Sequence, residues 1–290
     1  MSKLMYDVVI IGAGASGLVS AIVSARRGNK VLILEKNSTI GKKLLATGNG
    51  RCNITNIRPI PDRFYSQNRK FIISVLNEFN YQSIKQFFKS IGLELIEAKE
   101  GRVFPMSLQA SSVVDILGYE CKQLGVKILC ETEVKDITYD KSIYSIKHTK
   151  GKSTSKNIII ATGHKSAPQL GGVDDGVSFA KKFGHKRVDS FPSLVQLTSP
   201  MPNLKALAGV RVDSKVTLYK KDKKIEKRGD ILFTSYGISG LAILDISRFV
   251  LEELFTSSVV KLEIDLIPKM SYKQLIAIMR KSIRKKSLKP

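Results

Sequence analysis

The stretch YDVVIIGAGASGL, residues 6–18, determines the fold of the N-terminal part of this chain. It begins with residues 6–11, a run of aliphatic and β-branched side chains that is typical of a strand buried on both faces. Glycines at positions 12, 14 and 17 would weaken a continuous helix, but they suit a tight turn that opens into one. The stretch therefore predicts a strand, a glycine-rich turn and a helix in succession.

The residues that follow extend this pattern into a βαβ unit. Apolar residues recur at helical spacing over residues 18–25, and Gly28 with Asn29 supplies a left-handed stop. Residues 30–34 then form a second short apolar strand. Because such crossovers are right-handed, the two strands lie parallel and adjacent, with the turn at the carboxyl edge of the sheet. The predicted fold class is α/β, with a Rossmann-type domain on a parallel sheet.

The glycine-rich turn has the GxGxxG spacing of dinucleotide-binding sites. Gly12 permits the turn, Gly14 lets a pyrophosphate approach the N–H groups at the positive helix end, and Gly17 permits close packing of helix on strand. Glu35 follows 21 residues after Gly14, where a carboxylate accepts hydrogen bonds from ribose hydroxyls. An acid there disfavours a ribose 2′-phosphate, and hence NADP. The predicted dinucleotide-binding residues are Gly12, Ala13, Gly14, Ala15, Ser16, Gly17 and Glu35.

Two further segments carry residues suited to a cofactor. In the loop over residues 41–53, glycines permit close backbone approach, cations neutralise negative charge, and Asn side chains reach ring atoms. An ordinary surface loop is the alternative, because Gly and Asn are also the usual turn residues. The triplet Ala161-Thr162-Gly163 ends an apolar strand and returns the chain toward the same sheet edge, although a plain turn has this composition too. The candidates from the loop are Lys42, Lys43, Gly48, Asn49, Gly50, Arg51, Cys52 and Asn53.

Hydrophobic periodicity predicts the organisation of the remaining chain. The expected elements are helices over residues 71–79, 84–91 and 110–124, strands over 126–129, 133–137 and 157–161, and a polar hairpin over 140–156. After residue 189 the sequence changes to prolines and alternating strands such as 210–219, which indicates a separate β-rich domain. We therefore expect two domains, residues 1–189 and 190–290.

The chain is strongly basic, with 48 Lys and Arg against 25 Asp and Glu and a net charge of +23. Nucleic acid, an anionic membrane surface and polyanionic ligands all suit such a charge. The basic residues are nevertheless spread out, and only residues 269–289 gather enough of them to resemble a basic helix. We expect a mostly solvated charged surface and no specific nucleic acid partner, with a nucleic-acid-binding protein as a minor alternative.

The cysteines and the apolar N-terminal segment favour a cytoplasmic protein. Cys52, Cys121 and Cys130 form no CxxC pair, so neither a disulfide framework nor a zinc site is indicated, and a reducing compartment fits. Residues 8–25 are uncharged, but their glycines argue against a membrane anchor.

Several longer motifs together resemble the BaiN-type family of FAD-dependent oxidoreductases, some members of which are labelled aminoacetone-oxidase-like. They are residues 6–18, the pair Glu35-Lys36, GKKLLATGNGRCNITN at 41–56, GRVFP at 101–105, IIIATG at 158–163 and LFTSYGISGLAILDIS at 232–247. The resemblance covers nearly the whole chain. It implies FAD as the cofactor, Lys36 beside Glu35 in its site, the GNGRCN loop near the flavin, and residues 232–247 in an inserted β-rich domain. It also implies that the backbone of Val134 contacts adenine.

One feature departs from this family. Its members return from the inserted domain to the FAD domain through a closing glycine-rich segment, and no such segment precedes Pro290. The resemblance therefore implies an incomplete insert with a C-terminal helical segment. A catalytically inactive flavoprotein fragment is the alternative to an active enzyme.

The sequence identifies no catalytic residue. Cys52 beside Arg51 is a candidate thiolate, but it lacks the second cysteine that a flavin disulfide reductase needs. His164 is a candidate acid or base, whereas His148 and His185 are expected in polar surroundings. No metal-ligand spacing occurs, so the chemistry would belong to the flavin. We expect an FAD-dependent oxidoreductase that reduces an activated double bond or oxidises an amine of a small organic substrate, with NAD(P)H or oxygen as a transient redox partner.

Overall fold

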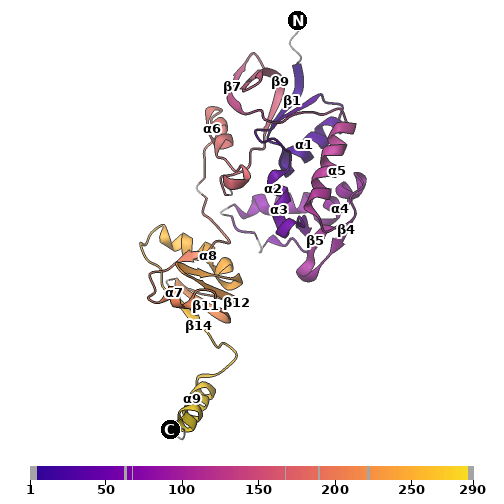
Figure 1. The fold of residues 1–290 in the computed structure, drawn as a ribbon. Helices are drawn as coiled ribbons and strands as arrows, with labels where there is room; N and C mark the ends of the chain where they lie inside the picture. The colour runs from indigo at the N-terminus through magenta and orange to yellow at the C-terminus, as the bar shows by residue number, and fades with distance from the viewer. Residues whose placement is uncertain are drawn as a thin grey trace. The chain divides into compact units, whose positions relative to one another are not determined.

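The computed structural model describes residues 5–61, 64–66, 68–166, 168–188, 190–220 and 223–286. The chain divides into two compact units, Met1–Arg187 and Val188–Pro290. Each unit has its own main sheet and its own hydrophobic core (Figure 1). The predicted domain ranges, 1–189 and 190–290, stay predictions, since compactness alone does not test independent folding.

The first unit is built on a six-stranded mixed sheet. Its strands lie in the order β6 (Lys127–Leu129), β2 (Val31–Leu34), β1 (Met5–Ile11), β9 (Gly151–Ile160), β8 (Ile143–His148) and β7 (Val134–Asp140). The first four are parallel, and β8 and β7 continue the sheet in antiparallel pairing. The predicted Rossmann-type α/β fold is confirmed, and the parallel part of its sheet ends at β9.

Helices cover both faces of the parallel strands. They are α1 (Ala15–Arg26), α5 (Ala110–Gln123) and α6 (Asp175–Lys182). Ile10 of β1 packs in the core with α1 and α5, whereas Ile11 packs in the core of the other face with Phe179 of α6. All four residues of β2 are buried. This double coverage explains the uninterrupted aliphatic runs of β1 and β2.

The described residues between 42 and 105 form short elements, some of which pack into the core beneath α1 and α5. These elements are α2 (Lys42–Leu45), the 3₁₀ turn η1 (Thr47–Gly50), β3 (Thr55–Asn56), α3 (Arg69–Glu78), α4 (Tyr81–Ser90), β4 (Leu95–Glu97), the 3₁₀ turn η3 (Lys99–Gly101) and β5 (Arg102–Pro105). The predicted helical pair is confirmed as α3 and α4. The loop predicted over residues 41–53 instead contains the helical turns α2 and η1. The antiparallel sheet β3-β5-β4 was not predicted, because its strands are too short for alternation to show.

The predicted polar hairpin over residues 140–156 is a regular strand pair. Lys141 and Ser142 join β7 to β8 with left-handed φ angles of 47° and 64°, so Asp140 pairs directly with Ile143. β9 then begins at Gly151 rather than at residue 157. The polar composition of residues 140–156 hid these long strands from the sequence analysis. An antiparallel pair can keep one face in solvent, so polar residues alternate along it with buried ones such as Ile146.

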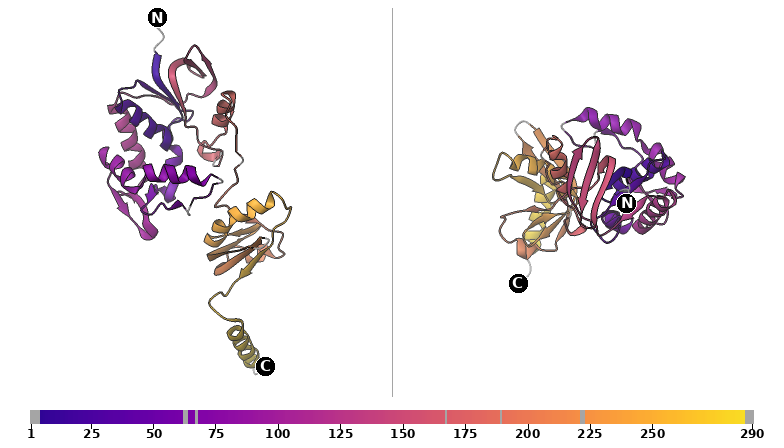
Figure 2. Two further views of the ribbon diagram at one scale, coloured as in Figure 1. Left: turned by 180° about the vertical axis from the view of Figure 1, so that it is seen from behind. Right: turned by 90° about the horizontal axis from the view of Figure 1, so that it is seen from above.

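The second unit is a five-stranded antiparallel sheet with helices. The strands lie in the order β10 (Leu197–Thr198), β13 (Gly237–Ser239), β12 (Lys223–Thr234), β11 (Arg211–Lys220) and β14 (Leu262–Asp265), and the described helices are α7 (Leu204–Leu207), α8 (Leu241–Leu254) and α9 (Tyr272–Lys286). α8 covers one face of the sheet (Figure 2), where Ile243 and Ile246 pack with Val216 and Ile231. The predicted β-rich fold with a helical tail is confirmed, whereas α8 was not predicted.

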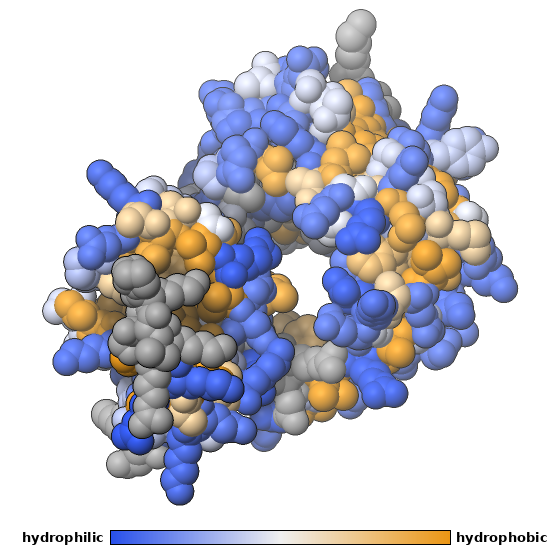
Figure 3. Space-filling view, turned by 60° about the horizontal axis from the view of Figure 1, so that its bottom comes forward, coloured by the Kyte–Doolittle hydropathy of each residue, from blue (hydrophilic) through white to orange (hydrophobic). Residues whose placement is uncertain are grey.

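Charged side chains are distributed widely over the surface. In the face shown in Figure 3, hydrophilic residues in blue surround smaller orange hydrophobic areas. Ion pairs such as Lys156 with Asp7 and Arg211 with Asp230, both 2.8 Å, lie at this solvated surface. Within the described ranges, no helix combines the length and the apolar composition that crossing a bilayer requires.

Candidate functional site

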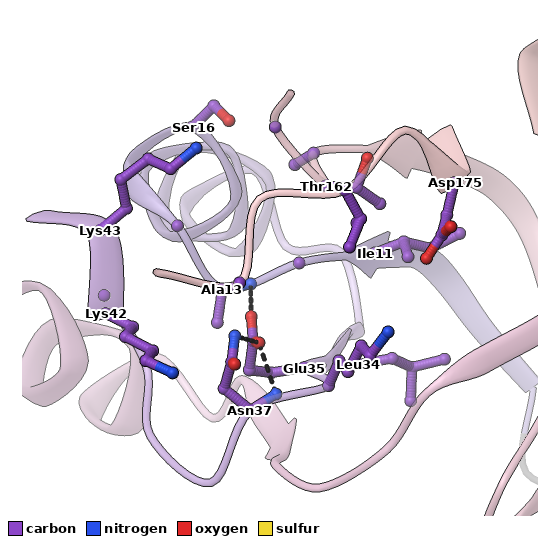
Figure 4. Close-up of a pocket in the computed structure, with 18 of the residues that line it drawn as sticks. Ile11, Ala13, Ser16, Leu34, Glu35, Asn37, Lys42, Lys43, Thr162 and Asp175 are labelled. Carbon is purple, nitrogen blue, oxygen red and sulfur yellow. Dashed lines mark hydrogen bonds between the residues drawn. The ribbon is translucent and has the colours of Figure 1, made fainter. Parts of the chain in front are cut away.

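A cavity of about 390 Å³ lies at the carboxyl edge of the parallel strands in the first unit (Figure 4). It is lined by the glycine-rich turn after β1, the residues after β2, α2, the start of β7, the end of β9 and α6. The predicted site residues that line it are Gly12, Ala13, Gly14, Ala15, Ser16, Glu35, Lys36, Lys42, Lys43, Val134, Ala161, Thr162 and Gly163. Segments far apart in the sequence thus meet at one sheet edge.

Two glycines of the turn are required by packing inside the protein. Gly12 has a φ of 104°, and a Cβ there would lie 2.5 Å from the carbonyl oxygen of Ala161. A Cβ on Gly17 would lie 1.9 Å from the carbonyl oxygen of Gly12. Both positions therefore exclude a side chain, and both contacts involve backbone that cannot easily move. Gly17 does not line the cavity, in agreement with a purely packing role.

Gly14 differs from these two glycines because nothing in the protein requires it. It has an ordinary extended conformation, with φ −77° and ψ −171°, and apart from its chain neighbours no protein atom lies within 4 Å of a Cβ built there. It is the N-cap of α1 and supplies no side-chain cap, and the first helical hydrogen bond runs from the Leu18 N–H to the Gly14 carbonyl. The N–H groups of the first turn are thus free of helical partners, and they mark the positive end of the helix. This open, positive position suits an anion.

The Glu35 carboxylate lies beside the turn and is satisfied by three N–H donors. Its Oε2 accepts from the Ala13 backbone N–H at 2.6 Å. Its Oε1 accepts from the backbone N–H of Asn37 at 2.8 Å and from the Asn37 side-chain amide at 2.6 Å (Figure 4). Only 7% of the Glu35 surface is exposed. The sequence did not indicate Asn37 as a site residue, because its hydrogen bonds to Glu35 are visible only in the folded structure.

The cations at the cavity come from α2 and from the segment that follows β2. The Gly41 N–H donates to the Ala13 carbonyl at 2.8 Å, which holds α2 next to the glycine-rich turn. The Lys43 side chain extends toward Ser16 in Figure 4, and its ammonium group donates to the His164 carbonyl at 3.2 Å. Lys36 is ion-paired with Glu133 at 3.2 Å. Positive charge is therefore placed at the same edge as the helix N-terminus.

Part of the remaining wall is provided by residues that sequence patterns did not single out. They are Leu170, Gly171, Val173, Asp175 and Phe179, together with Thr132. A Cβ on Gly176 would lie 2.2 Å from Thr162 Oγ1, so α6 packs closely on the end of β9. Val134 and Phe179 are buried in one cluster and give this end of the cavity an apolar surface.

The GNGRCN residues form a turn that does not line the cavity. Gly48, Asn49 and Gly50 have left-handed φ angles of 57°, 56° and 79°. Arg51 lies 5.1 Å from the centre of the Phe104 ring. The Asn53 amide, with its NH₂ group toward β5, donates to the backbone at 3.0 and 3.2 Å. The placement of these residues near a flavin stays a prediction from the family resemblance.

All three cysteine thiols have raised pKa values, including that of Cys52, which the sequence had made a candidate thiolate. Cys52 is 3% exposed and packs in the main core, and burial raises the pKa of its thiol, despite the neighbouring Arg51. Burial raises the pKa of Cys121 to about 11. Cys130 follows β6 rather than lying on it, and burial raises its pKa too. These environments favour neutral, unreactive thiols.

His164 is joined by a carboxylate that the sequence did not connect with it. Its Nε2 lies 3.9 Å from Oδ1 of Asp174, at the start of α6. Asp174 also faces Arg187 at 3.3 Å and Lys165 at 3.6 Å. His164 is absent from the cavity lining, so its proposed acid or base role stays a prediction.

His148 is buried, which corrects the expectation of a polar environment. It lies on β8 opposite Val134 and is 7% exposed. Its Nε2 is 3.0 Å from the hydroxyl of Ser153, whereas its Nδ1 has no hydrogen-bond partner in the described part of the chain. Burial lowers the pKa of His148 below its ordinary value of 6.5.

Mild acid is therefore expected to destabilise the first unit through His148. In the unfolded chain the imidazole takes up a proton near pH 6.5, but the folded chain keeps it neutral to lower pH. The unfolded state binds more protons in this window, so the free energy of unfolding falls as the pH falls. Between about pH 7.5 and about pH 5.5, His148→Gln should lose less Tm than the native protein. An equal fall in Tm for both proteins would contradict the assignment of this acid sensitivity to His148.

Comparison with known proteins gives a family match over most of the chain. The family model described as HI0933-like protein Rossmann domain matches residues 6–253. A 3-dehydro-bile acid delta(4,6)-reductase of Clostridium scindens is 35% identical over 274 residues, which cover 93% of this chain and 67% of that protein. Ribosomal RNA dihydrouridine synthases of Escherichia coli and Haemophilus influenzae are each 32% identical, over 84% and 97% of this chain and 61% and 69% of those proteins. The chain thus spans about two thirds of the length of these relatives.

Proposed function

The chain belongs to the HI0933-like family of Rossmann-domain proteins, and from this membership we propose an FAD-dependent oxidoreductase that reduces a carbon–carbon double bond conjugated with a carbonyl group. The membership confirms the family resemblance that the motifs indicated. The observation that carries the proposal is the cavity, where an uncapped helix N-terminus and the buried Glu35 carboxylate lie on either side of the Ala13 turn.

The residues of this cavity fit the ADP half of FAD. The open space at Gly14 is used by no protein packing, and a pyrophosphate placed there would meet the N–H groups of Ala15 and Ser16. Glu35 would accept a hydrogen bond from the adenosine ribose. The apolar surface at Val134 suits the adenine ring, and Lys43 would offset the negative charge of the phosphates.

FAD, when bound, supplies hydride transfer at its isoalloxazine ring. This chain would hold the ADP end through backbone groups and one carboxylate, which orients the cofactor without entering the chemistry. The sequence has a single GxGxxG turn, so we propose that a nicotinamide dinucleotide binds transiently as the electron donor.

The kind of bond reduced is inferred from what the relatives' names have in common. A bile acid delta(4,6)-reductase and a dihydrouridine synthase both have names that denote saturation of ring double bonds. In each substrate the double bond is conjugated with a carbonyl group, which makes one of its carbons an acceptor for hydride. The relatives thus differ in substrate but share a reaction type, and it is the reaction type that supports this proposal.

The proposal is tested with the purified chain in two steps. The visible spectrum and heat-released ligand should identify FAD at one per chain, or the chain should take up one added FAD. Under anaerobic conditions NADH or NADPH should bleach the flavin and a cyclic enone should restore its colour, whereas an amine should not bleach the oxidised flavin. A chain that binds no FAD, or a reduced flavin that reacts only with oxygen, would contradict the proposal.

A second candidate substrate is a uracil ring in ribosomal RNA, which the charge of the chain favours. The net charge of +23 suits a polyanion, and two relatives carry the name ribosomal RNA dihydrouridine synthase. With NADPH and rRNA that lacks the modification, the product would be dihydrouridine, detected by mass spectrometry of digested RNA. RNA binding should weaken steeply with salt. Enone reduction without any RNA product would leave the small-molecule substrate as the better assignment.

A further inference from the structure

Asn37 is held on three sides next to the Glu35 carboxylate. Its backbone N–H and its side-chain amide both donate to Glu35 Oε1, at 2.8 and 2.6 Å. Its own carbonyl accepts from the Glu131 N–H at 2.9 Å. A Cβ on Gly171 would lie 2.9 Å from the Asn37 amide, so the loop that includes Gly171 packs directly against it. Asn37 has little freedom to turn away from Glu35.

These contacts leave one accepting position of the carboxylate free. Each carboxylate oxygen offers two lone pairs. Asn37 occupies both on Oε1, and the Ala13 N–H occupies one on Oε2. The free lone pair is on Oε2, the oxygen bonded to the glycine-rich turn. Without the side-chain amide of Asn37, a single N–H would hold each oxygen. The carboxylate could then rotate about its last torsion, which has a broad energy profile, and this lone pair would lose its direction.

We propose that Asn37 is a positioning residue that makes the site selective for an adenosine ribose carrying a 2′-hydroxyl group. It acts through Glu35, by directing a single buried acceptor toward that hydroxyl. The inference rests on the proposed function, since it requires an adenine dinucleotide in this cavity. It adds a residue on which ligand choice depends, two positions after the predicted carboxylate.

The test compares two nucleotides that differ only in this hydroxyl. The full chain, freed of flavin, is titrated calorimetrically with ADP and with 2′-deoxy-ADP. Loss of a hydrogen bond to a charged group weakens binding about tenfold or more, so the native chain should bind ADP about tenfold tighter than 2′-deoxy-ADP. In Asn37→Ala the preference should fall to about onefold, while the affinity for 2′-deoxy-ADP changes less than about threefold. Asn77→Ala, at an exposed asparagine of α3, should keep the native preference.

An aspartate at position 37 makes the preference for ADP over 2′-deoxy-ADP depend on pH, which a merely structural role of Asn37 would not do. Asn37→Asp removes the amide donor and puts a second carboxylate beside Glu35. At about pH 8 it should show no preference for ADP. Toward about pH 5 the pair should share a proton, because two adjacent carboxylates cannot both ionise easily, and the shared proton would restore a donor to Glu35. The preference for ADP should therefore return on acidification in Asn37→Asp and stay absent in Asn37→Ala.

The outcomes separate this inference from the proposed function. If Asn37→Ala weakened both nucleotides in parallel and kept the tenfold preference, Asn37 would be merely structural and the inference would be overturned. A native chain that binds ADP and FAD but ignores the 2′-hydroxyl would overturn it too. A native chain that binds neither FAD nor ADP would instead overturn the proposed function.

Discussion

Replacing Gly14 with valine is expected to abolish flavin binding while leaving the first unit folded. The position has an extended conformation that valine accepts, and apart from its chain neighbours no protein atom lies within 4 Å of the new Cβ. The branched side chain would occupy the open space in front of the Ala15 and Ser16 N–H groups, where a pyrophosphate must approach. Loss of these bonds to a charged group should weaken FAD by at least about a hundredfold. The visible absorbance of the purified variant and a titration with FAD measure this directly.

The folding control for this variant is its thermal unfolding. Valine is a poorer N-cap than glycine, so the first unit should lose only about 1 kcal/mol. Gly14→Ala should give an intermediate loss of FAD affinity, because a single methyl group fills less of the space. Gly14→Val that retained one FAD per chain would remove the cavity from consideration as the cofactor site.

Replacing Gly17 with alanine is expected to have the opposite profile, a large loss of stability at a position that does not line the cavity. The added Cβ would lie 1.9 Å from the carbonyl oxygen of Gly12 and 3.5 Å from the Ala161 side chain. Both the turn and the end of β9 would have to shift, at a cost of about 3 kcal/mol. For a unit of this size that corresponds to a fall in Tm of roughly 6–12 °C.

The direction of this effect distinguishes packing from helix propensity. Alanine is favoured over glycine within a helix by about 1 kcal/mol, so an uncrowded Gly17 would give a more stable variant. Gly14→Ala is the matched control, the same substitution three residues earlier in open space, and its Tm should stay within a few degrees of the native value. An unchanged or raised Tm in Gly17→Ala would show that the helix and turn are less tightly packed than the structure indicates.

The sequence predicted those parts of the fold and the site that depend on local spacing. β1, α1 and β2 follow from aliphatic runs and glycines within 30 residues, and the GxGxxG turn with Glu35 follows from the same stretch. Asn37 and Asp175 could not be predicted as part of the cavity, because their positions depend on loops that approach from residues 131 and 171 and on the docking of α6. The burial of His148 was missed for a related reason, since polar strand residues do not reveal which face is covered.

The pairing of β1 limits when the first unit can fold during its synthesis on the ribosome. β1 lies between β2 and β9, and its register with β9 joins residues 5–11 to residues 154–160. During synthesis, the first strand therefore leaves the ribosome long before one of its two neighbours exists. Its apolar edge stays unpaired over that interval, which is a recognised hazard for aggregation and a reason for slow folding. We expect the nascent chain to depend on chaperones until about residue 160 has emerged, and ligand-binding competence to appear only after that point.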